Sequence, residues 1–201
     1  MGVDRGAGVT RSLRRGIMSA GASSGPDPVE YEITATQDAH IQVSGSGYTY
    51  TATYVDLREG TGGAARVGQF QFQVPEDTST DVTAAALDWV SAFACTGSTL
   101  TLTVASDVTG AIFTRDLRTD YSNGVSGNGT VAWEFPSAAA GGTGSSPDFA
   151  SVLASALQNS TPSGGYRWVA VCIQSSSGSG SAWPASVENA TYDAAVLRFT
   201  A

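Results

Sequence analysis

Few residues of this sequence carry side chains that could do chemistry, and they form no known catalytic pattern. There is one histidine, His40, and there are two cysteines, Cys95 and Cys172. A structural zinc site takes about four such ligands. The G-x-S-x-G motif of serine hydrolases does not occur in the chain. A lone histidine in a strand-like segment is typical of a packing or surface residue, so we expect no catalytic site and no metal site.

Carboxylates are the only abundant reactive groups, and they gather in two places. Residues 76–81 hold three acids directly after Pro75, and Asp116 and Asp120 lie on either side of Arg118. A calcium site needs six or more oxygen ligands, and the spacing of an EF-hand loop is missing here. We therefore expect solvated turn residues and predict no cofactor.

Both cysteines lie in apolar, strand-like stretches of the sequence. This position predicts buried free thiols. A disulfide between Cys95 and Cys172 stays open as an alternative, because the spacing of their Cα atoms decides it and the sequence does not give that distance.

Aromatic side chains form a second kind of candidate site. Tyrosines recur at even spacing in the segment 48–57, which places them on one face of a strand. Exposed aromatic rings can stack on sugar rings, whereas tyrosines at the edge of a sandwich core can simply hold their hydroxyls in water. The candidate glycan-binding residues are Tyr48, Tyr50, Tyr54 and Trp183.

Residues 1–28 differ in composition from the rest of the chain. This arm has four Arg and six Gly, and it contains too little apolar surface to offset the entropy lost on ordering. Its last part, residues 20–28, is a Gly/Ser/Pro linker. The first 20 residues carry a net charge of +3, and residues 30–201 carry −10.

A basic arm on an acidic body predicts that the arm lies on a neighbouring subunit or another partner. A solvated terminus is the alternative. The arm residues that we expect on a partner are Arg5, Arg11, Leu13, Arg14, Arg15 and Ile17.

Charge and hydropathy also bear on which partners to expect. The acidic body disfavours nucleic acid as a partner. No apolar run reaches the length of a membrane span, and the arm lacks the hydrophobic stretch of a secretory signal. We therefore expect neither nucleic acid nor a membrane as a partner.

Residues 29–201 are expected to form one β-rich domain of short strands separated by turn residues. Alternation or apolar runs predict strands over residues 29–35, 39–43, 48–57, 67–74, 82–93, 99–105, 111–117, 131–135, 167–174 and 195–200. The run 82–93 could also be a helix, and we favour a strand. The pattern predicts an all-β fold, an antiparallel β-sandwich or jelly roll, behind an extended N-terminal arm.

One short amphipathic helix is predicted over about residues 147–158. Ser146 would cap it, Pro147 would take the first helical position, and Asp148 would lie in the first turn. We expect this helix to lie across one end of the sandwich and to bury a stripe with helical spacing: Phe149, Val152, Leu153, Ala156 and Leu157.

Several motifs follow one another in a recognisable order. They are Asp38–Ile41, Arg66–Pro75, Ala85–Leu87, Val131–Pro136, Ser146–Leu157, Trp168–Ile173 and Leu197–Phe199. This order resembles the DNRLRE or disaggregatase-related β-sandwich domains, jelly-roll modules akin to carbohydrate-binding modules. The usual W-x-x-G after the helix is replaced here by residues 162–166.

The resemblance implies a fold without a shared catalytic residue, used as an adhesive or structural module in large secreted proteins and in phage virion proteins. All ten basic residues are Arg, which is typical of a GC-rich genome. We therefore expect a non-enzymatic phage virion structural protein, a capsid decoration or minor head or tail protein assembled in the host cytoplasm. Its expected partners are the major capsid protein or another virion protein, and a homo-oligomer such as a trimer. The alternative is a carbohydrate-binding module that recognises cell-surface glycans.

Overall fold

Two antiparallel sheets form the body of the protein. The computed structural model describes residues 9–12, 28–42, 48–49, 54–57, 65–109, 112, 115–175 and 180–201. Sheet A contains, in spatial order, β1 (Val9–Ser12), β2 (Glu30–Thr34), β11 (Val196–Thr200), β6 (Ala84–Val90) and β9 (Thr143–Ser145). Sheet B contains β4 (Tyr48–Thr49), β3 (Gln37–Gln42), β5 (Arg66–Pro75), β10 (Tyr166–Ser175), β7 (Ser98–Ser106) and β8 (Val131–Phe135). The expected all-β sandwich is confirmed.

The hydrophobic core lies between the two sheets, because their facing strands alternate. In sheet A the inward residues include Tyr31, Leu87 and Phe199, which are buried, whereas their chain neighbours are more exposed. Tyr31 stacks on Phe199 across the neighbouring strands β2 and β11, with ring centroids 4.7 Å apart. Sheet B contributes fully buried rings, Phe70 and Phe72 among them.

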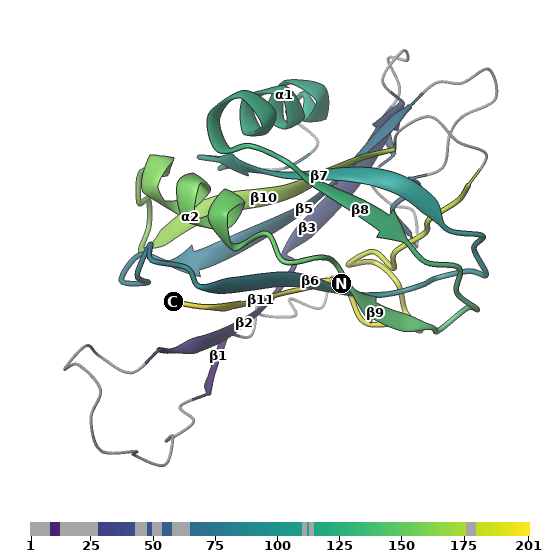
Figure 1. Cartoon of the computed structure of the whole chain (residues 1–201), viewed down its shortest axis with the longest axis horizontal. Coiled ribbons are helices and arrows are strands. Elements are labelled where there is room, and N and C mark those ends of the chain that lie inside the picture. Colours follow the sequence, from purple (N-terminus) through teal and green to yellow (C-terminus); the bar gives the residue numbers. More distant parts are fainter. Residues whose placement is uncertain are drawn as a thin grey trace, which may run out of the picture.

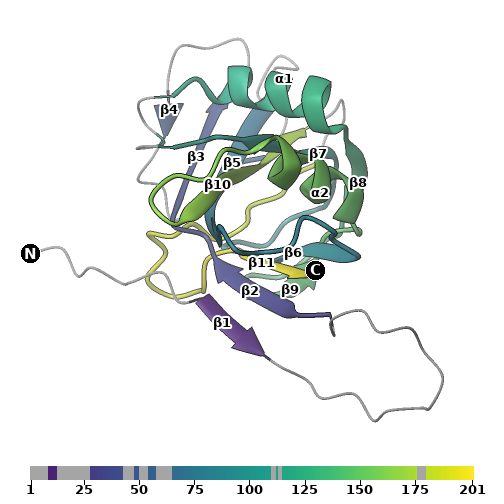
Figure 2. The same cartoon turned by 90° about the vertical axis from the view of Figure 1, so that its left-hand side faces the viewer.

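A helix that the sequence did not predict covers the outer face of sheet B. Helix α1 (Leu117–Asn128) lies above β7, β10, β5 and β3 (Figures 1 and 2). It comes close because Gly124 faces Thr103, where a Cβ would lie 2.8 Å from the threonine Oγ1. The strand expected over 111–117 is wrong where the structure describes it, since Leu117 begins α1.

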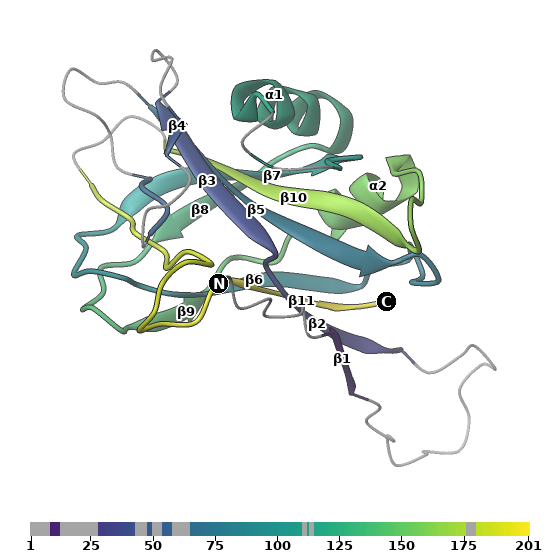
Figure 3. The ribbon, with the colours of Figure 1, turned by 180° about the vertical axis from the view of Figure 1, so that it is seen from behind.

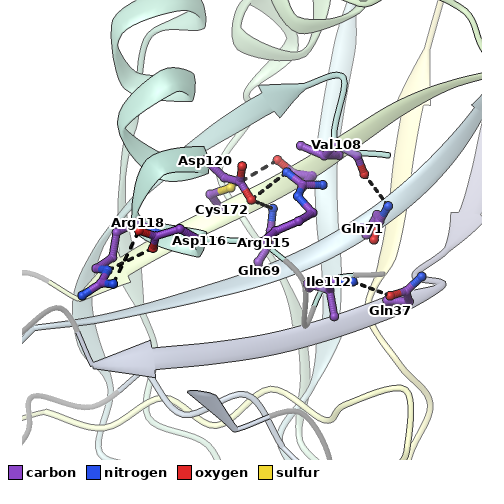
Figure 4. A network of polar contacts seen from close by, with 11 residues as sticks. Gln37, Gln69, Gln71, Val108, Ile112, Arg115, Asp116, Arg118, Asp120 and Cys172 are labelled. Atoms are coloured by element: carbon purple, nitrogen blue, oxygen red, sulfur yellow. Dashed lines mark hydrogen bonds and ion pairs between the residues drawn. The ribbon is translucent and has the colours of Figure 1, made fainter. Parts of the chain in front are cut away.

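Polar side chains fasten α1 and the segment before it to this face (Figure 4). Arg115 pairs with Asp120 at 2.6 Å, and Gln69 of β5 donates to the same carboxylate. Gln71 donates to the carbonyl of Val108. This cover explains why β5 is buried on both faces although its glutamines alternate with aromatic residues.

Helix α2 (Ala150–Asn159) packs against β6 of sheet A and against β7 and β10 of sheet B. It lies at the end of the sandwich away from β9, as Figures 1 and 3 show. The predicted stripe of Phe149, Val152, Leu153, Ala156 and Leu157 is buried. The helix predicted over 147–158 is therefore confirmed, with a later start and an end one residue on.

The expected start of this helix is wrong for a specific reason. Ser146 and Asp148 bind the edge of sheet A: Leu87 N–H donates to Ser146 Oγ at 3.0 Å, and Ala85 N–H donates to Asp148 Oδ1 at 2.9 Å. Asp148 also accepts from Ala150 N–H at 3.1 Å. These two side chains thus fix the approach to the helix, which begins at Ala150.

Part of the N-terminal arm belongs to the sandwich. Residues Val9–Ser12 form β1, the outermost strand of sheet A, paired antiparallel with β2 (Figure 2). Thr10 lies opposite Glu32, and Ser12 lies opposite Glu30. The sequence does not predict a strand in this segment.

Candidate functional site

Three aromatic rings that are far apart in the sequence meet at one place on the surface. Tyr54 and Phe93 have ring centroids 5.1 Å apart, Phe93 and Trp183 5.8 Å, and Tyr54 and Trp183 6.2 Å, all edge to face. Phe93 is 45% exposed, and the other two rings are half-buried. We call Tyr54, Phe93 and Trp183 the aromatic patch.

Backbone hydrogen bonds bring these segments together. Residues 182–185 run between residues 54–57 and the end of β6. On one side, Val55 N–H donates to Pro184 O at 2.8 Å, and Leu57 N–H donates to Ala182 O at 3.0 Å. On the other side, Ala92 N–H donates to Trp183 O at 2.8 Å. The patch is therefore held by main-chain pairing on both sides.

Segment 54–57 in turn lies directly on sheet B at a glycine. A Cβ at Gly68 of β5 would lie 2.4 Å from Val55 Cγ1 and 2.6 Å from Leu57 Cδ2. Only a residue without a side chain permits this approach. Gly68 is opposite His40 of β3, so the same close contact brings Tyr54 near His40.

Buried polar groups lie beneath the patch. The ring of His40 is 6.3 Å from that of Tyr54, and His40 Nδ1 accepts from Asp56 N–H at 3.3 Å. Asp56 forms an ion pair with Arg66. His40 and Asp56 are buried, with 7% and 1% of their surface exposed. They support the patch from below, and His40 is a packing residue, as its sequence context indicates.

Two further acids, Asp38 and Glu188, lie where the chain that follows Trp183 meets β3. Asp38, two residues before His40 on β3, is buried, and its carboxylate accepts from Val187 N–H. Burial, with Glu188 nearby, raises the pKa of Asp38 to about 8. Burial also raises the pKa of Glu188. At neutral pH Asp38 is therefore largely a neutral carboxylic acid that joins β3 to residues 187–188.

The other groups that could do chemistry have structural partners. Cys95 and Cys172 are buried and free, as the sequence predicts. Burial raises the pKa of the Cys172 thiol well above its usual range, which makes the thiol unreactive. Asp116 caps α1 through Arg118 N–H at 3.1 Å, and the hydrogen bonds from Arg118 lower its pKa.

Where the structure describes the chain, no three His, Cys, Asp or Glu side chains are grouped so as to hold a metal ion. In the same residues no helix has the length and apolar character needed to cross a membrane.

The structure bears on some of the predicted glycan-binding residues. Tyr54 and Trp183 lie together in the aromatic patch. Tyr48 lies in β4, opposite Ile41 of β3, whereas Tyr50 lies outside the described residues. The sequence does not single out Phe93, Asp38 or Asp56 as site residues. Phe93 ends an apolar run that reads as a buried strand, so nothing in its spacing marks a surface ring.

Most of the arm residues that we expect on a partner lie outside the residues that the structure describes. Of these residues only Arg11 is described, through its backbone in β1, which pairs with Tyr31 of the chain's own β2. In a single copy of the chain this position pairs with its own domain, and the expectation that it lies on a partner stays a prediction. The remaining arm residues, Arg5, Leu13, Arg14, Arg15 and Ile17, lie outside the described residues.

Sheet A has an open groove next to β1. It has a volume of about 460 Å³ and is lined by β2, β11, β6 and Asp148. Arg198 at its centre pairs with Glu32 and with Asp88. Glu30 and Asp148 add further negative charge, so the surface beside the arm is acidic.

Comparison with known proteins assigns no family. Neither the known protein families nor the curated protein sequences contain a match to this chain.

Proposed function

We propose that this chain is a non-enzymatic structural protein of a phage virion, a capsid decoration protein or a minor head or tail protein. Its N-terminal arm attaches it to the major capsid protein, another virion protein or sister copies, as a trimer or another homo-oligomer. Its place is the virion, assembled in the host cytoplasm. The order of sequence motifs that resembles DNRLRE-type modules supports this role.

The observation that carries the proposal is β1. This strand adds to a sheet edge through main-chain pairing along four residues, a mode of attachment that proteins also use between chains. The acidic groove beside it complements the four Arg of residues 1–28. Because the core between the sheets is built from strands after residue 29, the arm can serve attachment without being needed for the core.

Deletion of residues 1–28 tests this proposal. We expect the truncated chain to fold, because the buried core residues that the structure describes all follow residue 29. We also expect it to be missing from assembled particles when it replaces the full chain. Circular dichroism and thermal unfolding check the fold, and quantitative mass spectrometry of purified particles measures incorporation.

A control separates the arm from loss of stability. The variant Phe93→Ala keeps the arm and removes an exposed ring on the body, so it should be incorporated like the natural chain. Normal incorporation of the truncated chain would contradict the proposal.

The second candidate function is carbohydrate binding, and the aromatic patch is the observation that favours it. Aromatic rings at a surface can stack on sugar rings, and Tyr54, Phe93 and Trp183 form one surface cluster of rings. In this function the patch binds host cell-surface glycans.

A binding experiment with matched tyrosines tests this second function. Tyr54→Ala should reduce binding to purified cell-wall glycan by about tenfold or more, since a stacked ring contributes about 1–3 kcal/mol. Tyr166→Ala alters a half-buried tyrosine at the start of β10, outside the patch, and should not reduce binding. Equal binding by the natural chain and Tyr54→Ala, or no binding by either, would exclude the patch as a glycan site.

A further inference from the structure

We propose that the edge of sheet A at β2 accepts β1 from a second copy of this chain, so that neighbouring copies exchange their N-terminal strands. This inference deepens the proposed function and rests on it, because it names a second copy as the partner of the arm. The acceptor is the edge of Glu30–Thr34, and the donor is Val9–Ser12.

The acceptor edge exists without β1. On its other side β2 pairs with β11 along its whole length, from Thr34 opposite Val196 to Glu30 opposite Thr200. Hydrogen bonds in both directions between Val29 and Ala201, at 2.9 and 3.0 Å, extend this pairing. The strand is therefore fixed in the sheet by β11, and its other edge, where β1 of the same chain pairs, is a template for any strand of the right register.

The connection between β1 and β2 is far longer than their pairing needs. Ser12 lies opposite Glu30, a geometry that hairpins close with loops of about two to five residues. Here residues 13–29 separate them. At about 3.3–3.6 Å per residue this length of chain can span up to roughly 60 Å, enough to reach a neighbouring copy.

Exchange preserves the backbone pairing of β1 with β2. The same four residue pairs form whether the strand comes from the same chain or from another copy. The ratio of exchanged to unexchanged β1 therefore depends on two quantities. They are the concentration of β2 edges on neighbouring copies and the effective concentration of the chain's own β2 edge. A connection of this length gives an effective concentration on the order of 1 mM, which copies packed side by side on a particle would match.

Opposite charge alone would attract the arm to any acidic surface. A second copy offers opposite charge and also a strand edge in the right register. The acceptor strand carries Glu30 and Glu32, opposite Ser12 and Thr10, and the groove beside it adds Asp148. The first 20 residues have a net charge of +3. An arm that meets this edge on a neighbour therefore finds both backbone partners and opposite charge.

Two variants of the full chain, each with one added cysteine in addition to the buried Cys95 and Cys172, detect exchange directly when they are mixed. Thr10→Cys supplies the donor and Glu32→Cys the acceptor, and these positions are directly opposed in the register, within reach of a disulfide. A disulfide between the two variants forms only if β1 of one copy lies on β2 of the other. Mild oxidation and a non-reducing gel give the heterodimer fraction.

In an equal mixture we expect the heterodimer fraction to be below about one hundredth at 10 µM total protein and to rise to about one quarter at about 1 mM. The matched control mixes Thr10→Cys with Glu30→Cys, which changes a glutamate on the same face but two positions out of register, and it should form far less heterodimer. The double variant Thr10→Cys with Glu32→Cys should cross-link within the chain at 10 µM. This result would verify that cysteines at these two opposed positions can form a disulfide.

Absence of heterodimer at about 1 mM, while the double variant cross-links within the chain, would overturn strand exchange. Equal cross-linking of the out-of-register control would overturn it as well. Neither result touches the proposed attachment of the arm to another virion protein, which is decided by the incorporation of the chain lacking residues 1–28.

Discussion

Replacing Asp38 by Asn should remove most of the loss of stability that the protein suffers as the pH rises. The Asp38 carboxyl is buried beside Glu188 and accepts from Val187 N–H. An asparagine keeps an acceptor oxygen for that N–H but has no proton to lose. The variant therefore changes the titration of the site and leaves the hydrogen bond in place.

The size and sign of the effect follow from proton binding. The folded state holds the Asp38 proton up to a pKa of about 8, whereas the ordinary value is 3.8. Between about pH 4 and pH 8 the folded state therefore binds more protons than the unfolded state, and stability falls as the pH rises. At about 1.4 kcal/mol per tenfold change in proton affinity, the full loss from this group is about 6 kcal/mol.

Urea unfolding followed by tryptophan fluorescence at pH 5 to pH 9 measures this loss. The natural chain should lose several kcal/mol of unfolding free energy across the range, and Asp38→Asn should lose much less. The unfolding free energy of Asp38→Asn should still fall slightly as the pH rises, because burial also raises the pKa of Glu188. The control Asp81→Asn alters an exposed turn residue and should follow the natural chain. A flat curve for the natural chain, or an equally steep one for Asp38→Asn, would refute the reasoning.

Two further predictions concern the contacts that position the aromatic patch and helix α2. Gly68→Ala should lower the free energy of unfolding by about 1–3 kcal/mol because its Cβ would overlap Val55 and Leu57. Gly127→Ala, in α1 with open space around it, should instead raise the free energy of unfolding by about 0.5–1 kcal/mol. If both substitutions change this free energy in the same direction, the explanation by close approach at Gly68 is wrong. Asp148→Ala should cost about 1–3 kcal/mol, because Ala85 N–H and Ala150 N–H both lose their acceptor; an unchanged urea midpoint would show that water replaces the carboxylate.

Alternation of apolar and polar residues predicted most of the sandwich. The strand at Val131–Phe135 has the predicted bounds, and the expected strand over 67–74 lies within β5. These segments could be predicted because each has one face in the core between the sheets, so that local pattern and burial agree.

The errors arise where tertiary contacts override local pattern. Helix α1 has the sequence LRTDYSNGVSGN, and only Leu117 and Gly124 are buried in it. The segment therefore has no apolar stripe from which a helix could be predicted. It is held by close packing at Gly124 and by the Asp120–Arg115 ion pair, neither of which has a signature in a single sequence. The side chain of Ser146 suits a helix cap by its type, whereas in the structure it accepts a hydrogen bond from Leu87 N–H.

The candidate sites were only partly accessible from sequence for the same reason. Tyr54 and Trp183 were recognised as aromatic candidates, but their contact depends on the pairing of residues 182–185 with two distant segments. Likewise β1 is short and polar, with the sequence VTRS. It is a strand only because the edge of β2 is there to pair with it.

The central claim is that residues 1–28 attach the protein to its particle, and competition between two forms of the chain tests it most directly. Full-length chain and chain lacking residues 1–28 are supplied in equal amounts during assembly, and their ratio on purified particles is measured by mass spectrometry. Our account predicts particles that carry the full-length chain almost alone. An equal ratio of the two forms would contradict it.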